Sequence, residues 1–169
     1  MLPESASRPN AAIAEKGADV TPEQIAVVQT SWKRLAPIRE QAAGLFCARI
    51  EELDPGIGAL FRHPARVWSA TEAVRQMPPC SVQSALHAFG GLVTQLHAHA
   101  VWTPLARALG RRYGAMGLRS GHYATVAVAL LWTLEKALGP DFTPELRDAW
   151  TASYMEIASC LKDAALASA

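Results

Sequence analysis

The cysteine and histidine residues, which could bind a metal or act as nucleophiles, are scattered along this chain. The three cysteines are Cys47, Cys80 and Cys160. None of them belongs to a Cys-x-x-Cys pair or to a Cys/His cluster with the spacing of a zinc site. An odd number of widely separated cysteines favours reduced thiols over a disulfide framework. These residues by themselves therefore predict neither a structural zinc site nor a disulfide-rich fold.

Composition excludes several classes of partner. The chain has 169 residues, of which 50% are hydrophobic, and a formal net charge of +1. This length predicts one domain with a sizeable core. The near-neutral charge lacks the basic stripe of a nucleic-acid-binding protein and the polybasic patch of a membrane-surface protein. No apolar run is long enough to span a bilayer, and the N-terminus lacks the apolar region of a secretory signal. We therefore expect a cytoplasmic location.

Helical spacing dominates the elements that would position any site. Residues 1–20 are rich in Ala, Ser, Pro and charge and predict a disordered leader, with a targeting or partner-binding arm as the alternative. Two Thr-Pro-Glu sequences, starting at Thr21 and Thr143, are typical of capped helix starts. Gly139-Pro140 ends a long amphipathic segment. The pattern predicts about seven helices and no strand. Their expected ranges are 22–35, 38–52, 55–61, 81–99, 102–113, 122–138 and 144–162.

Four segments together resemble the globin family, in particular single-domain bacterial globins, neuroglobins and the globin domain of flavohaemoglobins. They read TPEQIAVVQTSWKRLAP, AGLFCARIEELDPGIGALF, LARALGRRYGAMGL and HYATVAVALLWTLEKALGPDFTPELRDAWTASY. The resemblance implies an all-α globin fold, a three-on-three helical sandwich, over residues 21–166. It also implies haem b, held in a pocket between the E and F helices.

The pocket positions implied by this resemblance depart from the family in three places. Phe61 matches the phenylalanine that stacks on the haem. Tyr113 stands where the proximal histidine is expected, within Leu-Gly-Arg-Arg-Tyr. Cys47 stands where the B helix often carries Tyr or Phe. The distal E-helix position falls on Ser81, followed one turn later by Ala85, although Pro78-Pro79 makes this register uncertain by a residue or more.

Two tyrosines carry the implied chemistry. Tyr113 has two interpretations: its phenolate binds ferric iron, as in haem proteins with a tyrosine ligand, or it fills a pocket that no longer holds haem. Tyr123 matches the G-helix tyrosine of flavohaemoglobins, but the acidic residue expected late in the last helix falls on Ala165. Cys47 is either a soft iron ligand or a small buried hydrophobe. The hydroxyl of Ser81 could donate to a bound ligand.

Two functions follow. The first is a haem-binding module that favours ferric iron and senses or binds a gas or takes part in redox chemistry, with Tyr113 as metal ligand. The alternative is a haem-free globin fold that is regulatory or binds an apolar small molecule. Peroxidase or dioxygenase chemistry is the weakest option, because the implied distal residues supply little acid–base help. A homodimer or an unidentified redox partner remains open.

Overall fold

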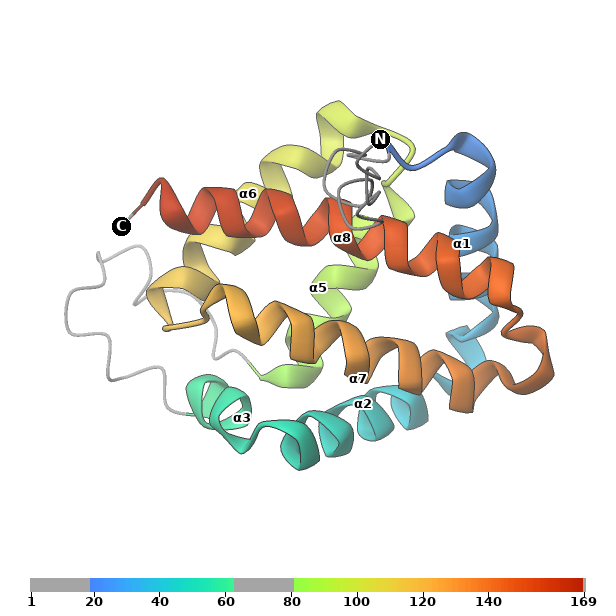
Figure 1. Cartoon of the computed structure of the whole chain (residues 1–169), viewed down its shortest axis with the longest axis horizontal. Coiled ribbons are helices and arrows are strands. Elements are labelled where there is room, and N and C mark those ends of the chain that lie inside the picture. The colour runs from blue at the N-terminus through green and yellow to red at the C-terminus, as the bar shows by residue number, and fades with distance from the viewer. Residues whose placement is uncertain (1–18, 63–80, 169) are drawn as a thin grey trace, which may run out of the picture.

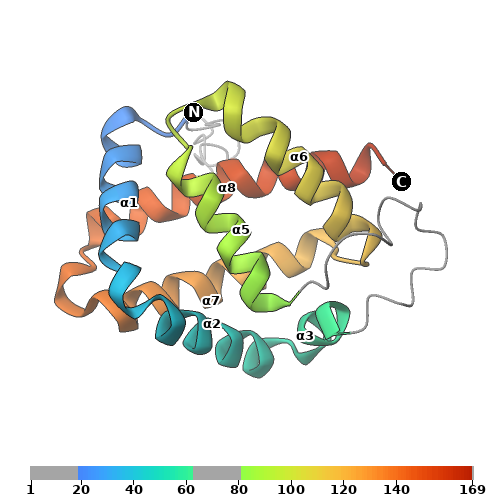
Figure 2. The same ribbon diagram turned by 180° about the vertical axis from the view of Figure 1, so that it is seen from behind.

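The computed structural model describes residues 19–62 and 81–168, and within these ranges the regular elements are helical. The α-helices are α1 (Pro22–Arg34), α2 (Arg39–Leu53), α3 (Pro55–Arg62), α5 (Val82–Thr94), α6 (His99–Ala115), α7 (Ser120–Leu138) and α8 (Pro144–Leu166). Six of these helices stack in two crossed layers, with α1, α5 and α6 on one side and α2, α7 and α8 on the other, and the short α3 follows α2 (Figures 1 and 2). The all-α prediction is confirmed. The predicted leader, residues 1–20, lies almost wholly outside the described residues.

Side-chain caps fix the two helix starts that the sequence indicated. The Thr21 hydroxyl accepts a hydrogen bond from the Gln24 amide at 3.2 Å, and the Gln24 side chain accepts one from the Thr21 amide at 3.0 Å. This reciprocal pair is a capping box. At the start of α8, the Thr143 hydroxyl accepts from the Leu146 amide at 3.2 Å. Each cap satisfies a backbone donor that the first helical turn leaves without a partner.

Two helix boundaries differ from the sequence-based ranges. Helix α5 ends at Thr94 rather than near residue 99. Helix α6 begins at His99, so Pro104 lies inside it rather than near its first turn. Trp102 explains the earlier start, because it is almost completely buried and its amide donates to the Ala98 carbonyl at 3.1 Å. Burial of this indole therefore outweighs the preference of proline for a helix start.

Helices α6 and α8 approach each other through their backbones. A Cβ atom added to Gly110 would lie 2.2 Å from the carbonyl oxygen of Leu161. One added to Gly114 would lie 2.8 Å from the Cβ of Ala165. Only glycine permits this approach at position 110, because any side chain would meet the backbone of α8. Close packing against α8 therefore fixes the position of α6, the helix that carries Tyr113.

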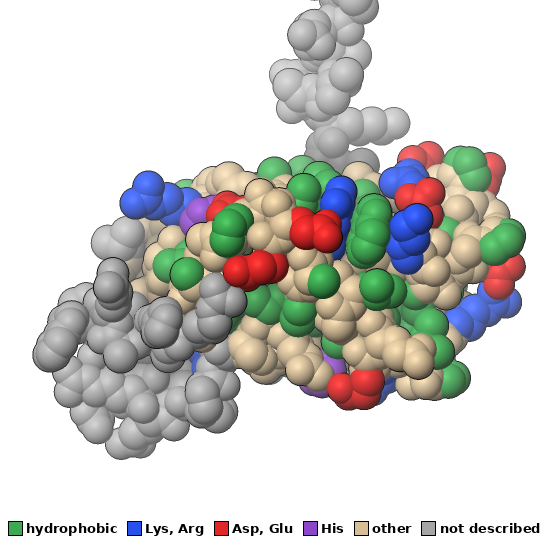
Figure 3. Space-filling view, turned by 90° about the horizontal axis from the view of Figure 1, so that it is seen from below, with side chains coloured by type: hydrophobic (Ala, Val, Ile, Leu, Met, Phe, Trp, Pro, Cys, Tyr) green, Lys and Arg blue, Asp and Glu red, His purple; other side chains and the backbone are tan. Residues whose placement is uncertain are grey.

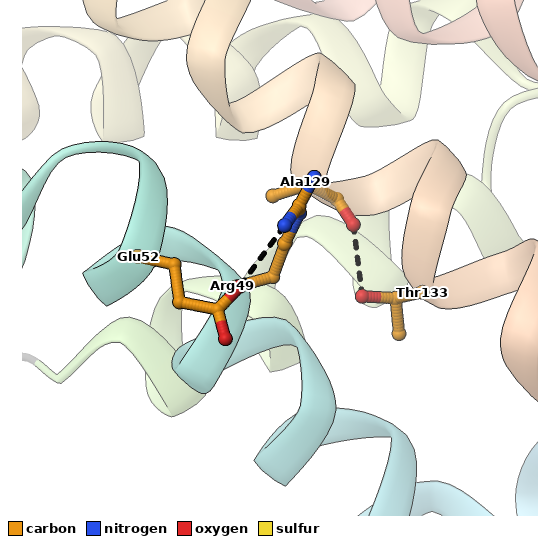
Figure 4. A network of polar contacts seen from close by, with 4 residues as sticks. All are labelled: Arg49, Glu52, Ala129 and Thr133. Atoms are coloured by element: carbon orange, nitrogen blue, oxygen red, sulfur yellow. Dashed lines mark hydrogen bonds and ion pairs between the residues drawn. The ribbon is translucent and has the colours of Figure 1, made fainter.

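Helices α2 and α7 pack through a mixed polar and aromatic contact. The Arg49 guanidinium lies 5.1 Å from the centre of the Trp132 ring and pairs with Glu52 at 2.9 Å. On α7 the buried Thr133 hydroxyl donates to the Ala129 carbonyl at 2.8 Å. Figure 4 shows the Arg49 and Thr133 contacts beside each other. Of these contacts, the one between Arg49 and Trp132 joins α2 to α7, the two helices low in Figure 1, while the other two lie within a single helix.

The face drawn in Figure 3 shows no continuous apolar patch among its described residues. On the side drawn in Figure 3, hydrophobic side chains are interleaved with charged and polar ones. Helix by helix, no described segment combines the length and the apolar character that crossing a bilayer requires. The proposed homodimer therefore stays a prediction.

Candidate functional site

An apolar cavity lies between α5 and α6 and reaches α2, α3, α7 and α8. It encloses about 70 Å³. Its walls are aliphatic and aromatic side chains from six helices and the corner before α7. The lining residues are Phe46, Ile50, Ile57, Phe61, Val82, Ala85, Leu86, Phe89, Leu92, Leu109, Tyr113, Leu118, Tyr123, Val126, Leu130, Tyr154 and Leu161. Among these described residues, only the three tyrosines carry a side-chain atom able to bind a metal or form a hydrogen bond.

Tyr113 and Phe61 meet inside this cavity. Their ring centres are 5.8 Å apart with an angle of 64° between the planes, an edge-to-face contact. The corner after α6 fixes the backbone of Tyr113, because its carbonyl accepts a hydrogen bond from the Leu118 amide at 3.0 Å. Gly117 has a φ of 99° in this corner, a conformation that favours glycine. The corner thus positions the last turn of α6 so that the Tyr113 ring packs against the Phe61 ring.

Tyr123 and Tyr154 enter the cavity from α7 and α8. The Tyr154 hydroxyl donates to the backbone carbonyl of Tyr123 at 2.7 Å, so its proton is committed. The Tyr123 hydroxyl is buried and has no hydrogen-bond partner. Burial raises the pKa of Tyr123 to about 12, and burial together with the neighbouring Tyr123 raises the pKa of Tyr154 further. Both phenols are therefore neutral at physiological pH.

Two residues that the resemblance placed at the pocket do not line the cavity. The Ser81 hydroxyl accepts from the Ser84 amide at 3.0 Å and caps the start of α5, where Ser81 is exposed. Its neighbour Val82 lines the wall instead. Cys47 is half-buried beside the lining residue Phe46, and burial raises the pKa of its thiol. The helical phase of α2 turns Phe46 rather than Cys47 toward the cavity. Four predicted residues, Phe61, Ala85, Tyr113 and Tyr123, do come together.

The histidines of the described residues lie outside the cavity lining. His122 accepts a hydrogen bond from the Arg119 amide at 3.0 Å, and its Nε2 lies 4.0 Å from Asp54. His97 contacts Gln29, and His99 stacks edge-on against Trp102. The described part of the chain also contains no group of three or more His, Cys, Asp or Glu residues that could hold a metal ion. Sequence reasoning missed Tyr154, which its burial on the apolar face of α8 could have indicated.

The fold and this cavity define a globin, and comparison with known proteins agrees. The globin family model matches residues 53–161, which is more than half of the chain. The chain belongs to the globin family. It is 26% identical over 136 residues to a neuroglobin of Danio rerio, covering 80% of this chain and 86% of that protein. It is 36% identical over 61 residues to a flavohemoprotein of Bordetella parapertussis, covering 36% of this chain and 15% of that protein.

A solved structure shares the fold. It is a hexacoordinated haem protein from an anhydrobiotic tardigrade, with a TM-score of 0.67 and 13% sequence identity. The match covers 85% of this chain and 94% of that chain. Family membership supports haem binding as the general function of the chain.

The lining residues are chemically suited to a haem, but the cavity must widen before a haem can enter. Apolar walls suit the faces of a macrocycle, and a phenol is a known haem ligand. The enclosed volume of about 70 Å³ is nevertheless small, since small-molecule sites typically measure about 300–1,000 Å³. A haem would have to stack on Phe61 and be ligated by Tyr113, so it would lie between these two residues. Their rings are now in direct contact. The two rings must therefore separate before a haem fits.

Proposed function

We propose that this globin binds haem b in the cavity between α5 and α6, with the Tyr113 phenolate as axial ligand of ferric iron. The observation that carries the proposal is the donor set. Tyr113 stands at the position of the family's proximal histidine, and no described histidine, cysteine or methionine lines the cavity. The sequence has no Cys-x-x-Cys-His motif for covalent attachment, which supports haem b over a c-type haem.

Some of the residues that would hold the haem offer a stacking surface or space, and one offers a ligand to its iron. Phe61 offers a ring face to the macrocycle, while Ala85 leaves space on the α5 side. Tyr113 offers a hard anionic oxygen, which stabilises Fe(III) relative to Fe(II). When bound, the haem supplies an iron centre that can change oxidation state or take a gaseous ligand. A redox or gas-sensing role, rather than reversible O₂ storage, follows from the preference for ferric iron. A cytoplasmic location is part of the same proposal.

Absorption spectroscopy of the purified protein during a hemin titration tests this function. We expect a Soret band that saturates at one haem per chain, with a phenolate-to-iron charge-transfer band. Tyr113→Phe should abolish the charge-transfer band, and Tyr113→His should give a globin-like spectrum. Tyr154→Phe is the matched control, because it removes a hydroxyl from the same cavity whose proton is already committed. If Tyr113→Phe leaves the spectrum and the hemin affinity unchanged, Tyr113 is not the ligand.

A second function is favoured by the contact between Phe61 and Tyr113. If the two rings stay together, the cavity excludes haem, and the chain is a haem-free globin that regulates a partner or binds a smaller apolar molecule. An engineered apolar cavity of about 150 Å³ stays dry and binds benzene. This cavity has about half that volume, so a ligand larger than a few atoms would have to displace lining side chains on binding. This function predicts a colourless, stable protein that binds no hemin and takes up a fluorescent fatty acid or a small aromatic probe. Stoichiometric hemin uptake would eliminate it.

A further inference from the structure

A surface groove between α6 and α8 shares no lining residue with the apolar cavity. It measures about 650 Å³, and small-molecule sites typically measure about 300–1,000 Å³. The Cys160 thiol of α8 lies 3.9 Å from the Thr103 carbonyl oxygen of α6 and joins the two walls. The polar and charged lining residues that matter below are Trp102, Thr103, Arg107, Glu156, Cys160 and Asp163. The groove is therefore large enough for a ligand in its present form.

Trp102 brings to this groove a hydrogen-bond donor that no acceptor uses. Its side chain is only 1% exposed, and its indole Nε1 has no hydrogen-bond partner among the described residues. A buried indole N–H usually finds an acceptor, because a buried donor without one is destabilising. The His99 ring meets Trp102 edge-on, 5.2 Å between centres, but its nitrogens contact the Thr103 hydroxyl instead. Because His99 is exposed, its ring can turn to admit the acceptor oxygen of a ligand.

Charged side chains converge on the same groove without pairing with one another. Burial raises the pKa of the Cys160 thiol, the charge and hydrogen bond of Arg107 lower it, and the carboxylates of Asp163 and Glu156 raise it. These three charges therefore lie around one thiol. The ion pairs among the described residues are formed by other side chains. With Asp19, the groove has three carboxylates and one guanidinium in its lining, so a ligand with net positive charge is complementary to it.

We propose that this groove binds a short basic peptide that carries two ammonium groups. The ammonium groups pair with Glu156 and Asp163, and the peptide carbonyl oxygens between them accept from Arg107 and from the Trp102 indole N–H. The two carboxylates are about two turns apart on α8, or about 11 Å along its axis. Two extended residues span about 7 Å, and a lysine side chain adds the remaining reach. A simple diamine would leave the Trp102 donor unpaired, whereas a peptide also supplies acceptors. This inference does not depend on the proposed function.

Titration of the full-length, ¹⁵N-labelled protein with the peptide Ala-Ala-Lys-amide tests the proposal by NMR. We expect saturable binding in which the indole N–H resonance of Trp102 moves and the other tryptophan indoles do not. The Trp102 resonance is the one missing from Trp102→Phe; should that variant not fold, its nuclear Overhauser contacts to the His99 ring identify it. Two matched peptides each lack one ammonium group: N-acetyl-Ala-Ala-Lys-amide and Ala-Ala-norleucine-amide. Each should bind about two- to fivefold more weakly.

A pair of protein variants locates the site. Asp163→Asn removes a carboxylate from the groove, and Asp148→Asn makes the same change at an exposed position of α8 outside it. We expect Asp163→Asn to weaken the binding of Ala-Ala-Lys-amide about two- to fivefold and Asp148→Asn to leave it unchanged. Absence of saturable binding, or binding that leaves the Trp102 indole resonance in place, would overturn the proposal. Equal affinities for the three peptides, or for the two variants, would overturn it as well. Hemin binding is measured separately, so none of these outcomes bears on the proposed function.

Discussion

Replacing Gly110 with alanine should destabilise the protein, because this glycine lies where α6 and α8 touch through their backbones. The new Cβ atom would lie 2.2 Å from the carbonyl oxygen of Leu161 and 2.8 Å from its Cα atom. Comfortable contacts between heavy atoms are about 3.5–4.0 Å, so the helices would have to move apart by roughly 1 Å or more. Neither atom of Leu161 can rotate away, since both belong to the backbone of α8.

The size of the effect follows from two opposing terms. Overpacking of a core contact costs about 1–3 kcal/mol. The better helix propensity of alanine returns about 1 kcal/mol. Because the clash involves backbone on both sides, the cost should lie at the upper end, and we expect a net loss of about 2 kcal/mol in the free energy of unfolding. For a chain of this size, that corresponds to a fall in Tm of about 4–8 °C.

Gly91→Ala in α5 is the matched control. Nothing lies within 4 Å of a Cβ atom at position 91, so only the propensity term acts there. We expect this variant to gain up to about 1 kcal/mol. Urea unfolding followed by far-ultraviolet circular dichroism measures both variants. If Gly110→Ala were as stable as the wild type while Gly91→Ala behaved as expected, the close approach of α6 and α8 would be wrong.

Three further predictions concern caps, buried phenols and a thiol. Thr143→Ala removes the cap of α8 and should cost about 1 kcal/mol in urea unfolding, whereas Thr143→Asp should retain most of that stability. Tyr123 has a folded-state pKa of about 12, above the ordinary value of about 10. Its contribution to stability is therefore complete below pH 10 and is lost as the pH rises through 12. Tyr123→Phe should accordingly unfold less steeply in an alkaline titration, and an identical profile would contradict this account. Because burial raises the pKa of the Cys47 thiol, iodoacetamide should modify Cys47 more slowly in the folded than in the urea-unfolded chain, as followed by peptide mass mapping.

Much of the fold could be predicted from local sequence. The Thr-Pro-Glu sequences at Thr21 and Thr143 indicated helix starts that the structure confirms, because a side-chain cap depends on residues within one turn. The resemblance to globins, carried by the order and spacing of four segments, is confirmed by the family match. The boundaries of α6 were less predictable. Helix α6 begins before Pro104 because Trp102 is buried against the rest of the fold. Such burial depends on tertiary packing and is not a local property of the sequence.

The candidate site divides in the same way. The sequence by itself predicted that Tyr113 replaces the family's proximal histidine and that Phe61 is retained, and it determined that both belong to a globin fold. Which side chains face the cavity depends on helical phase and on the space between elements, so only the tertiary structure could exclude Ser81 and Cys47 from its lining. Tertiary structure also decided that the rings of Tyr113 and Phe61 touch and that the Tyr123 hydroxyl is buried without a partner. Both results come from packing between helices distant in sequence, which local residue patterns do not encode.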